Sequence, residues 1–174
     1  MILKCHIAHK LPVIFMMGFL CLVAFQQRAV AQVKPPRPIT VFVNPAQGLS
    51  FGAFYQGVSG GTVIVYADGS RSVSGDIIQA NLGFSFSPAI FEVGALPGTL
   101  ISILNGPDVL LTGSNGGSMT LRIGASSSGS LFIATVGAPS TTQVRIGGTL
   151  TIGSPLTNPP GSYSGTFSVT FIQE

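Results

Sequence analysis

The sequence predicts an all-β protein whose single domain, residues 39–174, is an antiparallel β-sandwich of roughly ten strands. Apolar and polar residues alternate over long stretches, which is the period of a β-strand with one buried face. Turn signals rich in glycine and asparagine recur about every 8 to 12 residues, as is typical of sandwiches and barrels. Nowhere does an apolar period of 3.6 residues persist for three turns, so helix is not expected as a major component.

Residues 1–31 are expected to be a secretory signal peptide. Two lysines precede an apolar stretch from Leu11 to Phe25, and Ala29-Val30-Ala31 supplies a small-x-small cleavage site. We therefore expect cleavage between Ala31 and Gln32. The mature protein is then exported to the periplasm, the cell surface or the extracellular space.

Two alternatives to cleavage at this site disagree with the sequence. A transmembrane anchor needs about 20 apolar residues, more than this stretch offers. A lipoprotein signal would use Cys21, but Leu20 stands where a lipobox needs a small residue. We expect no membrane span in the mature chain. Residues 32–38 contain three prolines and are expected to form an extended leader.

Removal of the signal changes the composition. Residues 32–174 contain no histidine and no cysteine, so a serine nucleophile lacks its usual base, and zinc sites of imidazole or thiolate cannot form. Cationic and anionic side chains are equal in number, which gives no indication of a nucleic-acid partner. The cationic residues are Lys34, Arg37, Arg71, Arg122 and Arg145, and the anionic residues are Asp68, Asp76, Glu92, Asp108 and Glu174.

The carboxylates do not form an obvious site. A glycosidase needs two of them on either side of one bond, and calcium needs six to eight oxygen ligands. Asp68 has a turn role, Asp108 follows a proline, and no two acidic residues lie closer than eight positions. We therefore expect no catalytic residue, no metal site and no cofactor, and no enzyme activity.

The strands follow from alternation and turn residues. Asp68-Gly69 is the strongest hairpin signal and should join two antiparallel strands. Further turns are expected at 57–61, Pro97-Gly98, Asn105-Gly106 and 115–117, with a loop at 126–130. The expected strands are 39–43, 49–55, 62–66, 71–79, 87–93, 99–104, 109–111, 119–123, 131–133, 143–152 (with a glycine kink) and 161–172.

The terminal strand has the clearest pattern. Tyr163, Phe167, Val169 and Phe171 share one parity, and serine and threonine occupy the other. Gly165 interrupts the apolar face, where a missing side chain lets a neighbour approach closely. A strand of this length needs a sheet partner.

Two groups of side chains have competing interpretations. Phe51, Phe54 and Tyr55 could form an aromatic platform for sugars, although aromatic residues on a half-buried strand are more often part of the core. Arg71, Arg122 and Arg145 occur singly in strands and are expected on the solvent face.

Several segments form an ordered set that covers nearly the whole chain after the signal. They are Leu49-x-Phe51-Gly52, Gly60-Gly61-Thr62-Val63-x-Val65, Asp68-Gly69-x-Arg71-Ser72-x-Ser74-Gly75, Ser87-Pro88-Ala89-x-Phe91-x-Val93, Pro97-Gly98, Val144-x-Ile146-Gly147-Gly148-Thr149-Leu150-Thr151 and Gly161-x-Tyr163-Ser164-Gly165-Thr166-Phe167-x-Val169-Thr170. This set resembles the bacterial exported family called domain of unknown function 4402. The resemblance implies a signal peptide and a β-sandwich, and the family's function is unassigned.

A looser resemblance connects the C-terminus to subunits of chaperone–usher pili and to spore-coat-U-type pilins. Gly161 is the fourteenth residue from the end and is followed by alternating apolar residues, as in those pilins. The penultimate residue is Gln173 where they have tyrosine, and no cysteine is left for their common disulfide. The resemblance implies an immunoglobulin-like or pilin-like sandwich. It makes Gly161, Tyr163, Phe167, Val169 and Phe171 a candidate assembly strand.

Two functions remain open. The first is a non-enzymatic bacterial surface or fimbria-like structural subunit that assembles by strand addition, with other copies, related subunits and a periplasmic chaperone as partners. The alternative is a monomeric secreted adhesin or a module that binds glycan or matrix.

Overall fold

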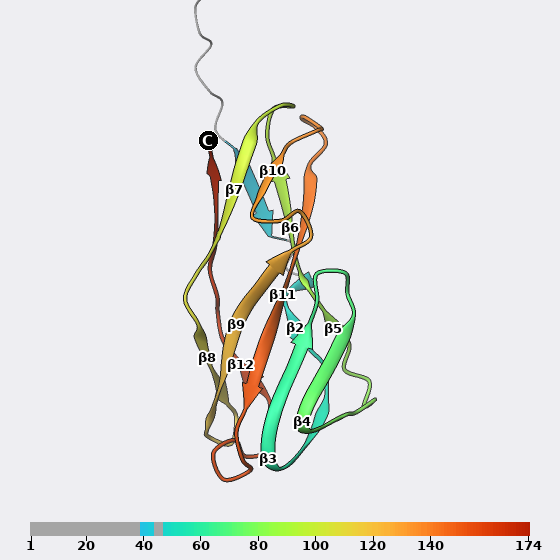
Figure 1. Ribbon diagram of the computed structural model, residues 1–174, viewed down its shortest axis with the longest axis vertical. Coiled ribbons are helices and arrows are strands. Elements are labelled where there is room, and N and C mark those ends of the chain that lie inside the picture. The colour runs from blue at the N-terminus through green and yellow to red at the C-terminus, as the bar shows by residue number, and fades with distance from the viewer. Residues whose placement is uncertain (1–38, 44–46) are drawn as a thin grey trace, which may run out of the picture. The chain divides into compact units, whose positions relative to one another are not determined.

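The computed structural model describes residues 39–43 and 47–174, all in one unit of the chain (Figure 1). Its strands pair antiparallel, and no α-helix occurs within these residues, so the predicted all-β sandwich-like fold is confirmed. The signal, the Ala31–Gln32 cleavage site and the leader lie outside the described residues. The strands are β1 (Thr40–Val43), β2 (Ser50–Phe51), β3 (Phe54–Val65), β4 (Arg71–Gln79), β5 (Phe86–Ser87), β6 (Ala89–Gly94), β7 (Leu100–Asn105), β8 (Val109–Gly113), β9 (Ser118–Ser126), β10 (Leu131–Ile133), β11 (Thr142–Ile152), β12 (Tyr163–Ser164) and β13 (Val169–Gln173).

The larger sheet is organised around β11. Its order is β1-β6-β11-β9-β8-β12, while β3 also pairs with β11 and β4 pairs with β3. The first half of β11, Thr142–Ile146, pairs with β6, and the second half, Gly148–Ile152, pairs with β3. A Cβ at Gly147 would overlap the carbonyl oxygen of Val65, so only glycine fits where β11 changes partner. The predicted glycine kink is confirmed as a shift in register with β9 at this point.

A second layer covers part of the larger sheet. It is a three-stranded sheet of order β10-β7-β13, and Figure 1 shows β7 beside the C-terminal strand. Phe91 of β6 and Phe171 of β13 join the layers, with ring centroids 5.5 Å apart. Ile101 of β7 and Ile146 of β11 are fully buried, because each lies on the inner face of its sheet. A separate pair, β2 with β5, completes the fold.

Two predictions near the N-terminus were wrong. Residues 49–55 are not one strand, because Gly52 has a φ of 69° and separates β2 from β3. Residues 57–61 do not form a turn, because β3 continues through them and pairs with β4 on both sides of a bulge between Gln56 and Gly61. The glycines there allow the bulge rather than a reversal of the chain. The Asp68-Gly69 hairpin between β3 and β4 is confirmed.

The predicted terminal strand, 161–172, is interrupted. Its alternation is confirmed, since Tyr163, Phe167, Val169 and Phe171 are half-buried against the core and the intervening polar residues are exposed. However, it crosses between layers: β12 pairs with β8 in the larger sheet, and β13 pairs with β7 in the smaller one. The chain likewise crosses between layers after Asn105, which the sequence predicted as a turn. The crossing in the terminal segment, the break at Gly52 and a break at Pro88 divide three of the expected strands into shorter ones.

Candidate functional site

The candidate assembly residues belong to the protein's own sandwich. Tyr163 pairs with Gly113 of β8, and Val169 and Phe171 lie in β13. The contact predicted at Gly165 is confirmed, because a Cβ there would come within 2.7 Å of the Leu111 side chain. Within the described residues, β12 pairs only with β8 and β13 only with β7, so each has one edge without a strand partner. Such edges are the positions where another extended chain can add.

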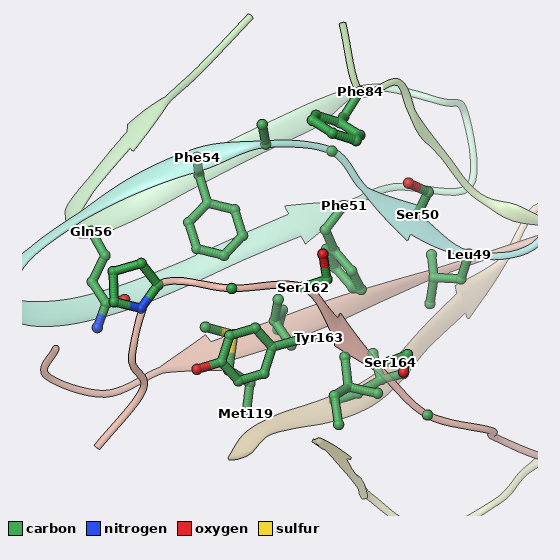
Figure 2. Close-up of a pocket in the computed structure, with 18 of the residues that line it drawn as sticks. Leu49, Ser50, Phe51, Phe54, Gln56, Phe84, Met119, Ser162, Tyr163 and Ser164 are labelled. Carbon is green, nitrogen blue, oxygen red and sulfur yellow. The ribbon is translucent and has the colours of Figure 1, made fainter. Parts of the chain in front are cut away.

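A groove of about 680 Å³ lies beside this segment. One wall is the chain around β2 and the start of β3, from Leu49 to Gln56. The opposite wall is the C-terminal segment Pro159–Gly165, called here the C-terminal wall. Figure 2 shows Phe54 on the first wall and Ser162 and Tyr163 on the C-terminal wall, with Met119 below them. None of the lining side chains is charged, and the groove offers apolar surface interspersed with main chain and uncharged polar side chains such as Ser50 and Gln56.

The floor of the groove comes from the larger sheet. Leu111, Met119, Leu121 and Leu150 line it with their inward-facing side chains, and all are buried. The three-stranded sheet does not pair with β2 or β12, so at this place the inner face is covered by short strands and loops instead of a continuous second layer. The groove is therefore a gap in the second layer above the core.

The C-terminal wall is held by hydrogen bonds. Asn158 is 1% exposed, the one polar residue that is buried in the described part of the chain. Its amide oxygen accepts from the Gly153 N–H at 2.5 Å, and its amide nitrogen donates to the Ser118 carbonyl at 2.5 Å. The Tyr163 hydroxyl donates to the Pro159 carbonyl at 2.6 Å. Because these bonds fix the loop before β12, this wall is ordered before any ligand arrives.

The opposite wall is held by Arg71. Its guanidinium donates to the carbonyl oxygens of Phe51 at 2.9 Å and Ala53 at 3.2 Å. It also lies 4.5 Å from the ring centroid of Phe86, a cation–π contact. The prediction that Arg71 faces solvent was therefore wrong, because the break at Gly52 leaves carbonyl groups that need donors. Arg122 and Arg145 are exposed, as predicted.

The aromatic residues of the predicted sugar platform do not share one face. Phe51 is buried, and Phe54 packs against the core, which agrees with the core interpretation. Tyr55 alternates with Phe54 along β3 and is 57% exposed, next to Ile78 of β4. The three rings therefore do not form one exposed platform: Phe51 is buried, Phe54 is half-buried at the groove, and Tyr55 is the exposed ring.

The carboxylates remain dispersed. Asp68 Oδ1 accepts hydrogen bonds from the hydroxyl and the main-chain N–H of Ser70, and these bonds hold the pKa of Asp68 below its ordinary value. Asp76 accepts a hydrogen bond from the Ser59 N–H at 3.3 Å. Across residues 39–43 and 47–174, no three histidine, cysteine or acidic residues gather into a metal-binding group.

Sequence reasoning missed the groove because its walls come from distant parts of the chain. One local signal lies in the sequence, since Leu82, Phe84 and Phe86 alternate with small residues. Leu82 and Phe84 stand at the groove and are 56% and 71% exposed. As to membranes, the described residues contain no helix with the length and apolar character needed for a span.

Comparison with known proteins gives one match. Neither the curated proteins nor the solved structures include a significant match to this chain. Residues 41–172 match the family described as Domain of unknown function (DUF4402), which is most of the chain and nearly all of the described fold. The chain therefore belongs to the family described as Domain of unknown function (DUF4402).

Proposed function

We propose that this protein is a non-enzymatic, exported structural subunit of the bacterial surface, fimbria-like in character, that assembles by strand addition. The observation that supports this most is the uncharged groove beside the unpaired edge of β12. An extended segment of a partner adds its main-chain hydrogen bonds along such an edge. Its alternate side chains enter the groove and set the register.

The energetics favour an apolar donor segment. Each leucine or phenylalanine side chain that becomes fully buried contributes about 1.5–3 kcal/mol, and no charged group lines the groove to oppose this. The hydrogen bonds of Asn158 and Arg71 fix both walls in advance, which lowers the entropy cost of binding. Other copies, related subunits and a periplasmic chaperone are the proposed partners.

The proposal is tested on protein released from the surface of its native host by mechanical shear, without denaturant. We expect species much heavier than the monomer in sedimentation velocity, and electron microscopy should show linear assemblies. Strictly monomeric surface protein at all concentrations would rule the proposal out.

The second candidate is a monomeric adhesin or a module that binds glycan or matrix. The exposed ring of Tyr55 beside Ile78 favours it, because aromatic rings stack on sugar faces. It predicts a monomer whose melting temperature rises with a glycan ligand. Tyr55→Ala should abolish that rise, whereas the melting temperature of a structural subunit should not rise with glycan in the first place.

A further inference from the structure

The loop between β4 and β5 presents apolar side chains that its own domain does not cover. Leu82 is 56% exposed, Phe84 is 71% exposed and Phe86 is 39% exposed. Residues 80–85 belong to no strand, and Gly83 has a φ of 81°. Exposed aromatic and aliphatic side chains that gather next to a concave apolar surface are characteristic of protein–protein contact sites.

This loop stands at the mouth of the groove. Leu82 and Phe84 both line it, and Figure 2 shows Phe84 on the same side as Ser50 and Phe54. One face of the molecule therefore carries both a receiving groove and side chains able to enter one. A surface that is complementary to itself in this way favours a two-fold contact between identical chains.

Charge does not oppose such a contact. No residue between Ala80 and Ser87 is charged, and no side chain that lines the groove is charged. The nearby guanidinium of Arg71 is already bonded to main-chain carbonyl groups. Arg71 is thus the cation nearest to the contact, and it keeps its bonds to the carbonyl groups of Phe51 and Ala53 and its contact with the Phe86 ring when two copies approach.

We propose that two copies of this chain pair face to face, with Leu82 and Phe84 of each copy seated in the groove of the other. The pair goes beyond the proposed function and uses the same groove, so a donor strand would compete with it. Leu82 and Phe84 expose on the order of 250 Å² per copy. Made twice, and counted with an equal area of the partner that it covers, the contact buries at most about 1,000 Å². This is the small end of specific interfaces, so the pair is weak.

The test uses sedimentation equilibrium of the mature protein at concentrations from about 1 µM to 1 mM. Phe84→Asp removes the inserted side chain, and Ser162→Trp fills the groove from an exposed position. Each should raise the Kd of the pair at least about 100-fold, because a symmetric pair loses both of its contacts. Leu131→Asp is the matched control, an exposed leucine in the three-stranded sheet, and should leave the Kd unchanged.

Mixing the two variants gives the sharpest result. Phe84→Asp leaves both walls and the floor of the groove in place and changes only its mouth, while Ser162→Trp keeps an intact loop, so an equimolar mixture should form a heterodimer with one remaining contact. If Ser162→Trp fails to fold, Ser164→Trp replaces it, since Ser164 is also exposed and lines the groove. A monomeric wild type, equal effects of Phe84→Asp and Leu131→Asp, or no association on mixing would each overturn the pair.

The two proposals fail in distinguishable ways. If surface assemblies persist in a host that carries Phe84→Asp and the pure protein shows no pairing, the pair is wrong and the proposed function stands. If the pure protein pairs through Phe84 but surface protein is never larger than this pair, the pair stands and the structural-subunit proposal is wrong.

Discussion

The ring of Phe167 meets the ring of Phe91 edge-on, with 6.5 Å between the centroids and 79° between the planes. Phe91 belongs to β6 in the larger sheet, and Phe167 lies in the C-terminal segment between β12 and β13. Edge-to-face pairs of this kind contribute about 0.5–1.5 kcal/mol beyond the burial of their surface. The contact therefore fastens the segment that crosses from one layer to the other.

We predict that Phe167→Asp unfolds the domain or destabilises it by several kcal/mol, because a carboxylate would replace a ring packed on the core. Chemical denaturation followed by circular dichroism measures the loss. Thr166→Asp is the control, since Thr166 is exposed and should change stability by less than about 0.5 kcal/mol. Equal denaturation midpoints for the two variants would contradict the packing described for Phe167.

Asn158→Ala should lower the free energy of unfolding by about 2–4 kcal/mol. The substitution leaves the Gly153 N–H and the Ser118 carbonyl without their partner, and each unsatisfied buried group costs about 1–3 kcal/mol. Asn115→Ala is the matched control: its amide bonds the Pro160 carbonyl from an exposed position, and its loss should cost less than about 1 kcal/mol. Urea denaturation distinguishes the two. A smaller loss for Asn158→Ala than for Asn115→Ala would refute the role given to the buried amide.

Gly147→Ala should destabilise the protein by about 2 kcal/mol or more, because the added methyl group would collide with the carbonyl oxygen of Val65. Nothing lies within 4 Å of a Cβ placed at Gly48, so Gly48→Ala should be neutral or slightly stabilising. Thermal unfolding of both variants provides the comparison. If Gly147→Ala melts at the wild-type temperature, the main chains do not approach as closely as described.

The Asp68 turn predicts a pH dependence. The hydrogen bonds from Ser70 depress the pKa of Asp68 in the folded state below its ordinary value of 3.8. Its contribution to stability is therefore fully present above 3.8 and is lost as the pH falls through the lower folded pKa. Wild-type protein should lose more stability than Asp68→Asn on acidification from about pH 5 to pH 2. Parallel curves of denaturation midpoint against pH would argue against these bonds.

Export predicts a mature N-terminus at Gln32. Intact mass spectrometry of protein recovered from the native host should show a chain without residues 1–31, with Gln32 free or cyclised to pyroglutamate. A mass that retains the signal, or a diacylglyceryl group on Cys21, would show that the predicted processing is wrong.

Short sequence patterns predicted the structural features that depend only on neighbouring residues. The hairpin at Asp68-Gly69 was predictable because its turn residues themselves favour the required backbone angles, and Gly69 has a φ of 90°. The burial parity of the terminal segment was predictable because alternation decides which face meets the core, whatever the partner strand. Both features need only the sequence within a few residues.

Features that depend on distant partners could not be predicted. The glycines of 57–61 suit a turn or a bulge equally well, and the pairing of β3 with both β4 and β11 decides for the bulge. Arg71 bonds to the carbonyl oxygen of Phe51 because β2 ends nearby at Gly52 and leaves carbonyl groups there that need donors. The groove could not be predicted because its two walls are far apart in the sequence. One wall lies around β2, and the other begins more than a hundred residues later.

The branching of β11 has a consequence for how the chain folds during synthesis. β3 and β6 both find their main-chain partner in β11, which is among the last strands to be made. Until it emerges, the β3–β4 hairpin and the β1–β6 pair each have an apolar face and one edge that lacks its partner. Folding that waits for such long-range pairing is slow, and the open edges and apolar faces are exposed to aggregation in the meantime.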